Sequence, residues 1–97
     1  MLQVCTKDTF SIILNSDTRN ENLEKLNTYI QNSNSQYMTI DISSMNIIDA
    51  SAVASLGSTM HYIKYPEGAI SWIVNSTKVK EYTTSMNLGN SKFIYKK

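Results

Sequence analysis

Short apolar runs alternate along the chain with stretches in which apolar residues recur every three or four positions. The short runs predict β-strands at residues 9–14, 37–42, 69–74 and 92–95. Met38, Ile40 and Ile42 alternate with polar residues, which places them on one face of their strand. The run at 69–74 is nearly continuous, as in a strand covered on both faces, and it predicts Trp72 in the core. Residues 2–5 form a weaker candidate strand, antiparallel to its neighbour.

The stretches between these strands have helical spacing. Thr18 and Glu21 fit a capping box that opens the first helix. A second helix is expected over about residues 50–64, and a third begins at Ser76 and ends at Gly89. The residues expected to face the core are Leu23, Leu26 and Ile30 in the first helix, Val53, Leu56, Met60 and Ile63 in the second, and Val79, Tyr82 and Met86 in the third.

Strands that alternate with helices predict an α/β fold with crossover helices. We expect a single domain over residues 1–97, with a mixed, mostly parallel sheet of four to five strands and three helices. In such sheets the functional surface lies where strands end and helices begin. Here that edge holds residues 15–18, 41–51 and 75–77.

Composition narrows the class of protein. The 97 residues carry 9 Lys and Arg against 8 Asp and Glu, so no basic surface is expected and nucleic acid is not a predicted partner. No apolar run is long enough to span a membrane, and the start does not resemble a signal peptide. A single cysteine, Cys5, and a single histidine, His61, argue against a disulfide and a metal site. These features predict a cytoplasmic protein without metal or cofactor.

The densest polar cluster covers residues 41–52, between the second main strand and the second helix. Asp49 or Ser51 is expected in the cap region of that helix, where free backbone amides and a partial positive charge are exposed. Two readings stay open. In the first, both residues only cap the helix. In the second, Ser51 is a phosphorylation site whose phosphate the amides would hold while Asp41 and Asp49 repel it.

The same cluster resembles the signature of the STAS domain, a family that includes the bacterial anti-sigma factor antagonists. The similar segments are IDIS at residues 40–43 and IDASAVASLG at residues 48–57. Gly68 before the strand at 69–74, and Val79 with residues 86–88, extend the resemblance over residues 9–95. Two small residues differ, because Ala50 replaces the family's first serine and Ala52 replaces its glycine.

The resemblance implies a protein-binding role in transcription regulation and no catalysis. The serine that matches Ser51 is phosphorylated by an anti-sigma factor kinase, which binds the unphosphorylated form and releases the phosphorylated one. Asp49 matches the acidic residue before that serine, and Asp41 matches the aspartate that closes the strand. The residues expected to bind the partner are Asp41, Ser43, Asp49, Ala50, Ser51, Ala52 and Ser55.

Other roles remain open. Some STAS domains are accessory subunits of ABC-type lipid transporters, where the same helix contacts the ATPase subunit, and others act as scaffolds without a phospho-switch. An enzyme is a weaker reading. Ser51, His61 and Asp49 are the residue types of a hydrolase triad, but His61 lies ten positions along the same helix from Ser51, about 15 Å away. We expect His61 to be a solvent-exposed helical residue.

Overall fold

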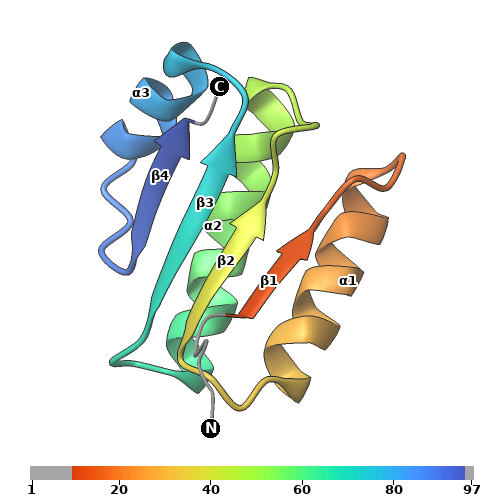
Figure 1. Cartoon of the computed structure of the whole chain (residues 1–97), viewed down its shortest axis with the longest axis vertical. Coiled ribbons are helices and arrows are strands. Elements are labelled where there is room, and N and C mark those ends of the chain that lie inside the picture. Colours follow the sequence, from red (N-terminus) through yellow and green to blue (C-terminus); the bar gives the residue numbers. More distant parts are fainter. Residues whose placement is uncertain (1–9, 96–97) are drawn as a thin grey trace, which may run out of the picture.

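The computed structural model describes residues 10–95 as three helices alternating with four strands (Figure 1). Their order along the chain is β1 (Phe10–Ile13), α1 (Arg19–Asn32), β2 (Tyr37–Asp41), α2 (Ile47–Lys64), β3 (Ala69–Val74), α3 (Thr77–Ser85) and β4 (Ser91–Tyr95). The predicted α/β class is confirmed, and so are the four main strands within a residue or two. The candidate strand at residues 2–5 lies outside the described residues.

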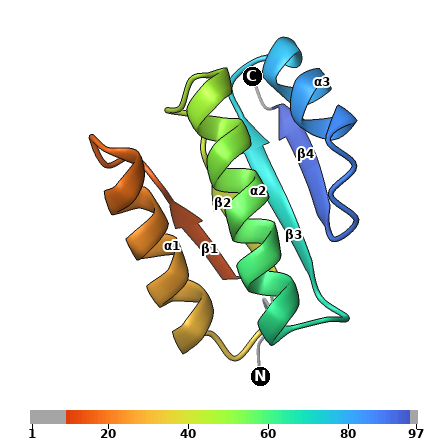
Figure 2. The same cartoon turned by 180° about the vertical axis from the view of Figure 1, so that it is seen from behind.

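The four described strands form one sheet in the order β1-β2-β3-β4, and every pair is parallel. The sheet is therefore wholly parallel over residues 10–95, and the antiparallel strand that would make it mixed is the candidate at residues 2–5. Crossover connections of this kind share one hand. Each new strand is added at the same edge of the sheet, so every crossover passes over the same face. All three helices therefore lie against that one face (Figure 2).

The core lies between the sheet and these helices. Met38 and Ile40 of β2, with Ile42 just beyond it, are at most 2% exposed, as the alternation predicted. Trp72 of β3 is fully buried, also as predicted, and its ring stacks on Phe93 of β4 with centroids 6.3 Å apart.

The opposite face of the sheet is covered by no helix among residues 10–95. The continuous apolar run of β3 predicted a strand covered on both faces, but only alternate residues of β3 are buried. By register, the side chains on the open face are those of Ser11, Ile13, Tyr37, Thr39, Asp41, Ala69, Ser71, Ile73, Lys92 and Ile94. Ile13 and Tyr37 are the exposed large hydrophobic side chains on it, at 59% and 50%.

The first helix begins where the sequence predicted. The Thr18 hydroxyl accepts a hydrogen bond from the Glu21 backbone N–H at 3.1 Å, which is the N-cap half of a capping box. Leu26 and Ile30 are fully buried, and Leu23 packs against the core from a half-buried position. The predicted inward face of α1 is thus confirmed.

The second helix packs on the sheet mainly through small residues, so its predicted inward stripe is only partly right. Val53 is buried and Met60 packs against the core from a half-buried position, but the prediction is wrong for the other two members. Leu56 is 50% exposed and Ile63 is 75% exposed. At Gly57, an added Cβ would lie 2.6 Å from Leu26 Cδ2 and 2.8 Å from Trp72 Cη2. Because α2 approaches its neighbours this closely, its larger residues are turned outward. The buried residues of α2 are Ala50, Val53, Ala54, Gly57, Ser58 and His61.

His61 is fully buried, so the predicted exposed histidine is also wrong. Its ring lies 5.4 Å from the ring of Tyr65, measured between centroids. Neither ring nitrogen has a hydrogen-bond partner with normal geometry. Burial lowers the pKa of His61, and the nearby Gln36 carbonyl opposes this shift only in part. The imidazole is therefore held neutral at pH 7.

The third helix differs from its prediction at its inner face and at its end. Ser76 is the N-cap, as predicted, and accepts from the Val79 N–H. Tyr82 is 51% exposed, however, and Thr83 is buried in its place with its hydroxyl donating to the Val79 carbonyl at 2.7 Å. The helix ends at Ser85, and the left-handed residue that follows is Asn87, with φ of 56°, instead of the predicted Gly89.

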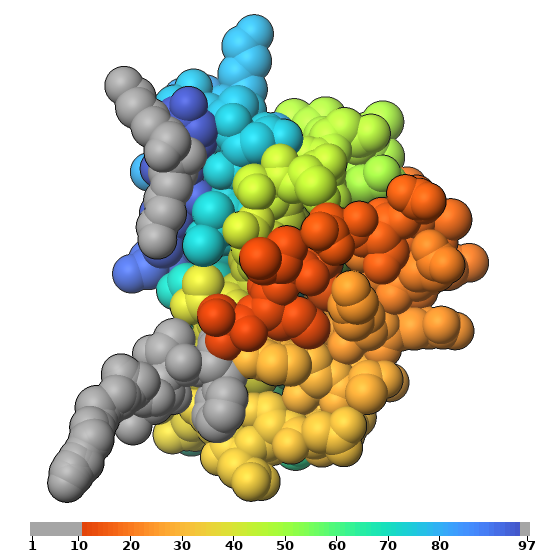
Figure 3. All heavy atoms as spheres, turned by 45° about the vertical axis from the view of Figure 1, so that its right-hand side comes forward, coloured from red at the N-terminus to blue at the C-terminus, as the bar shows by residue number. Residues whose placement is uncertain are grey.

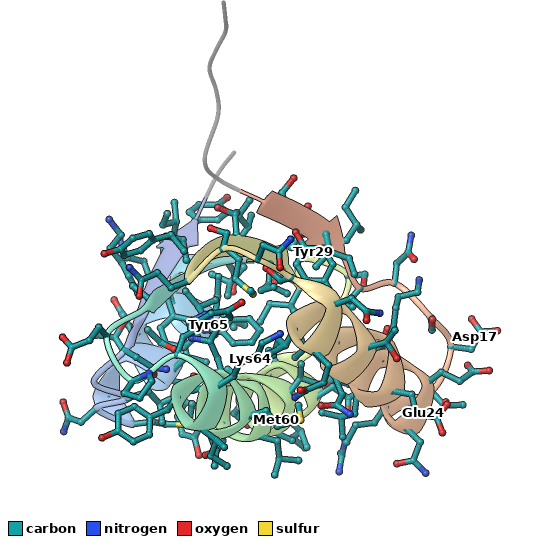
Figure 4. The ribbon with its side chains drawn as sticks, turned by 90° about the horizontal axis from the view of Figure 1, so that it is seen from below. Asp17, Glu24, Tyr29, Met60, Lys64 and Tyr65 are labelled. Carbon is teal, nitrogen blue, oxygen red and sulfur yellow. The ribbon has the colours of Figure 1, made fainter. Side chains whose placement is uncertain are left out.

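Lys64 ties the end of α2 to the end of α1 (Figure 4). Its ammonium nitrogen is close to three carbonyl oxygens, those of Ile30 at 2.9 Å, Gln31 at 2.5 Å and Ser33 at 3.1 Å. The last carbonyls of a helix lack intrahelical partners and carry partial negative charge. The Tyr65 hydroxyl donates to the Ser33 carbonyl as well. This end of α1 is therefore capped by side chains more than thirty residues further along the chain.

Candidate partner-binding surface on the second helix

The second helix starts earlier than the sequence predicted. Its N-cap is Asn46, whose side-chain oxygen accepts from the Asp49 N–H at 2.8 Å. Asp49 is then the third helical residue and Ser51 the fifth. The prediction that Asp49 or Ser51 occupies the cap is wrong, because Asn46 is the N-cap and its side chain already accepts from the Asp49 amide. An asparagine three residues before an acidic residue is a cap signal that was present in the sequence.

The loop before α2 is fixed by its own polar groups. The Asp41 carboxylate accepts from both the backbone N–H and the hydroxyl of Ser43, at 2.9 and 2.6 Å. The Asn75 amide, just beyond β3, donates to the carbonyls of Ser43 and Met45 at 3.0 Å each. Asp41 and Ser43 thus lie at the predicted edge of the sheet, where their hydrogen bonds hold the turn into α2.

An ion pair links the starts of α1 and α2. Arg19 donates to the Asp49 carboxylate from two of its nitrogens, at 2.9 and 3.1 Å. Both side chains are roughly 40% exposed, 45% for Arg19 and 38% for Asp49, so the pair adds little stability. Asp49 was predicted to contact a binding partner, but in the structure its carboxylate is already paired with Arg19. No local sequence pattern identifies Arg19 as the partner, because it lies thirty residues from Asp49.

Ser51 lies in the second turn of α2 and is half-buried, with its hydroxyl donating to the Ile48 carbonyl at 3.0 Å. Ala52 and Ser55 are half-buried as well. Ala50, in contrast, is fully buried and faces the core. The structure thus brings most of the predicted partner-binding residues to one end of α2 but places Ala50 behind that surface.

Sequence reasoning missed an apolar surface along the outward face of α2, the helix at the centre of the helical layer (Figure 2). Its large side chains are Ile48, Leu56, Tyr62 and Ile63, which are 66%, 50%, 58% and 75% exposed. We call these four, with the smaller Ala52, Ser55 and Thr59 between them, the α2 surface. The helix has no Asp, Glu, Lys or Arg between Asp49 and Lys64. Two of these residues, Leu56 and Ile63, were predicted to face the core, which concealed the outward stripe.

Elsewhere, a groove of about 800 Å³ runs beside α1 and is lined by residues such as Ile12, Glu24 and Tyr29. It lies on the flank where β1 and α1 are side by side (Figure 3). The Tyr29 hydroxyl is buried there without a hydrogen-bond partner, and burial raises its pKa. None of the residues predicted to bind a partner lines this groove.

The described part of the chain brings no three His, Cys, Asp or Glu residues together as a metal site would need. None of its helices is long and apolar enough to cross a membrane. His61 is buried on the inner side of α2 and does not accompany Ser51 to the surface. Comparison with protein-family models, with curated proteins and with solved structures finds no match for this chain. The similarity to STAS domains therefore stays a prediction from the residues.

Proposed function

We propose that this chain is a non-enzymatic protein-recognition module that binds a regulatory partner through the α2 surface. The observation that supports the proposal best is the exposure of Ile48, Leu56, Tyr62 and Ile63 on one uncharged face of a helix. Large apolar side chains that gather on the outside of a domain typically mark interaction sites. Interface centres are depleted of charge and enriched in aromatic residues.

The partner we propose is an ATPase of the class that the STAS resemblance implies, an anti-sigma factor kinase, in a bacterial cytoplasm. Asp49 and Ser51 lie beside Ile48 at the start of the α2 surface. The loop at Asp41 and Ser43 precedes them and is held by hydrogen bonds, so this end of the surface is preorganised for docking.

Ser51 is the proposed switch. On a helix, residues three and four apart are neighbours, so Ser51 adjoins Ile48 and Ser55. A phosphate on Ser51 would add a charge of about −1.5 to −2 at the rim of an apolar surface. It would also break the hydrogen bond from the Ser51 hydroxyl to the Ile48 carbonyl. Burying that charge against an apolar partner is costly, so phosphorylation is expected to release the partner.

The experiment is affinity capture from a lysate of the source cells with the tagged full chain as bait. We expect wild type to retain a kinase-type ATPase. Leu56→Glu and Ser51→Asp are both expected to lose it. Ile13→Glu is the matched control, because Ile13 is 59% exposed on the open face of the sheet, away from α2.

Equal capture by all four baits would contradict the proposed surface. Retention of an ABC ATPase by wild type and Ser51→Asp alike would replace the switch with the transporter role. A purified chain that hydrolyses an ester or a nucleotide, and loses this with Ser51→Ala, would overturn the non-enzymatic proposal.

A further inference from the structure

Strand β1 lies at an edge of the sheet and turns unused backbone groups outward. Among residues 10–95 its only neighbour is β2. The Leu14 N–H, just beyond β1, donates to the Asp41 carbonyl of β2 at 2.9 Å. Backbone groups alternate in direction along a strand, so those of Ser11 and Ile13 point away from β2. A row of such N–H and C=O groups is a template for pairing with another strand.

The two edges of the sheet differ in how they are protected. Native edge strands are commonly blunted by a charged side chain, often lysine, or by proline. The edge strand β4 has an exposed lysine, Lys92, at its second position. Strand β1 reads Phe-Ser-Ile-Ile and has neither device, and its Ile13 side chain is 59% exposed. Of the two edges, β1 is therefore the one that is open to pairing.

The groove of about 800 Å³ follows this open edge. Ile12 of β1 lines one side, residues of α1 from Glu21 to Asn32 line the other, and its surface is mainly apolar. The groove runs along α1, which has 14 residues and is about 21 Å long. An extended segment of about six residues, at about 3.3 Å per residue, has the same length.

The shape of this corner suits a single extended strand. Packed helices lie about 8–10 Å apart and paired strands about 4.8 Å apart, so a layer of three helices is wider than the sheet beneath it. Figure 1 shows α1 lying beyond β1 at this edge, and Figure 3 shows the two side by side along the flank. A further copy that continued the sheet would bring its own helices against α1. An extended peptide carries no helix and avoids that collision.

Two polar features of the groove favour a peptide with a basic residue. The Tyr29 hydroxyl is buried where α1 meets the sheet (Figure 4) and has no hydrogen-bond partner in the described part of the chain, so a peptide carbonyl or N–H can meet it. Glu21 and Glu24 outnumber Lys25 along the groove, and none of the three forms an ion pair within residues 10–95. A lysine or arginine of the peptide would balance that charge.

We propose that the groove between β1 and α1 binds an extended peptide, which pairs with β1 as an added strand. Alternate apolar side chains of the peptide enter the groove beside Ile12, and a basic residue lies near Glu24. In recognition of this kind, backbone hydrogen bonds give affinity and the groove gives specificity. The proposal goes beyond the proposed function, because the α2 surface takes no part in it. It is tested without the regulatory partner, so the two proposals can fail separately.

The probe is the peptide acetyl-Lys-Val-Thr-Val-Thr-Val-Lys-amide, titrated into the isotope-labelled full chain and followed by NMR. We expect amide shifts at Ser11 and Ile13 and a dissociation constant below about 1 mM. Hydrogen exchange at these two amides should slow at least about tenfold at saturation. The same peptide with glutamate in place of both lysines should bind at least about fivefold more weakly.

Three variants locate the site. Ser11→Pro should abolish binding, because proline removes the outward N–H and leaves the groups that pair with β2 in place. Glu24→Lys should weaken binding of the lysine peptide at least about fivefold and strengthen binding of the glutamate peptide. Leu56→Glu is the matched control, because it alters the α2 surface and should bind the lysine peptide as wild type does. Circular dichroism checks that each variant is folded.

The results that would overturn the proposal are distinct. One is the absence of shifts at Ser11 and Ile13 with the lysine peptide at about 1 mM. Another is equal binding by wild type and either groove variant. Shifts at these amides that depend on the concentration of the chain alone would assign the edge to a second copy. Peptide binding that appears only in Leu2→Asp/Val4→Asp would assign it to the first residues of this chain.

Discussion

Replacing Lys64 by methionine tests how far the fold depends on one ammonium group. Methionine keeps the length of the aliphatic chain and removes the charge and its donors. In the structure that ammonium is within 3.1 Å of three carbonyl oxygens in or just after the last turn of α1. The variant therefore breaks a long-range contact while leaving α2 itself intact.

The size of the effect follows from these contacts. A hydrogen bond to a charged group contributes about 1.5–3 kcal/mol, and a cation at a helix C-terminus contributes up to about 2 kcal/mol. The three contacts share one ammonium, and water can reach the freed carbonyls because Lys64 is only half-buried. We therefore expect a loss of about 2 kcal/mol in the free energy of unfolding. For a domain of this size that lowers the melting temperature by about 8–16 °C.

Urea unfolding followed by circular dichroism measures the loss, and an unchanged slope would show that the denatured state is the same. Hydrogen exchange should also accelerate at the Ser33 amide, which donates to the Ile30 carbonyl at the end of α1. Lys25→Met is the control, because Lys25 is exposed along α1 and is expected to change stability by less than about 0.5 kcal/mol. If Lys64→Met and Lys25→Met unfold alike, the capping argument is refuted.

Three further predictions concern buried or capping positions. Folding lowers the pKa of His61, so the unfolded chain binds more protons than the folded one, and the free energy of unfolding should fall as the pH drops below about 6.5, by at most about 1.4 kcal/mol per pH unit. His61→Gln should remove that part of the pH dependence in urea unfolding measured at several pH values. Identical pH profiles for the variant and wild type would contradict this prediction. Gly57→Ala should cost about 1–3 kcal/mol through overpacking, whereas Gly89→Ala, which has nothing within 4 Å of its added Cβ, should be close to neutral in thermal unfolding. Asn46→Ala should cost about 1 kcal/mol as the true N-cap of α2, and an equal or larger loss from Ser51→Ala would show that the cap is misplaced.

The strands and two of the helix starts could be predicted because their signals are local. Successive side chains of a strand point to opposite faces of the sheet, so the spacing of Met38, Ile40 and Ile42 predicted that they share a buried face. Thr18 and Ser76 each bond an amide three residues away, which short sequence patterns can identify.

The facing of α2 could not be predicted from periodicity, because the helix has two apolar stripes and only one meets the sheet. The choice depends on the space that Leu26 and Trp72 leave above the sheet, into which Gly57 fits and Leu56 does not. Likewise, Thr83 is buried in place of Tyr82 because its hydroxyl is satisfied within its own helix. These outcomes are properties of packing, which a single sequence does not display.

The candidate site was predicted in position but not in detail. The polar cluster after β2 does lie at the carboxyl edge of the sheet, as the topology required. Its ion pair joins Arg19 to Asp49, and no pattern in one sequence connects residues thirty positions apart. The α2 surface was not predicted because two of its four large residues, Leu56 and Ile63, were assigned to the core.

The succession of strands in the sheet has a consequence for synthesis on the ribosome. Within residues 10–95, each strand after β1 pairs with the one made just before it, so none of these strands must enter between two earlier ones. Translation adds roughly 5–20 residues per second, and the stretch from Val74 to Tyr95 therefore takes about 1–4 s. Over that interval the edge of β3 has no neighbour, and the Trp72 indole N–H lacks the Ser91 hydroxyl that accepts from it at 2.9 Å. The nascent chain is thus most prone to aggregate in the interval between the synthesis of β3 and that of β4, and the pairing of β4 ends that exposure.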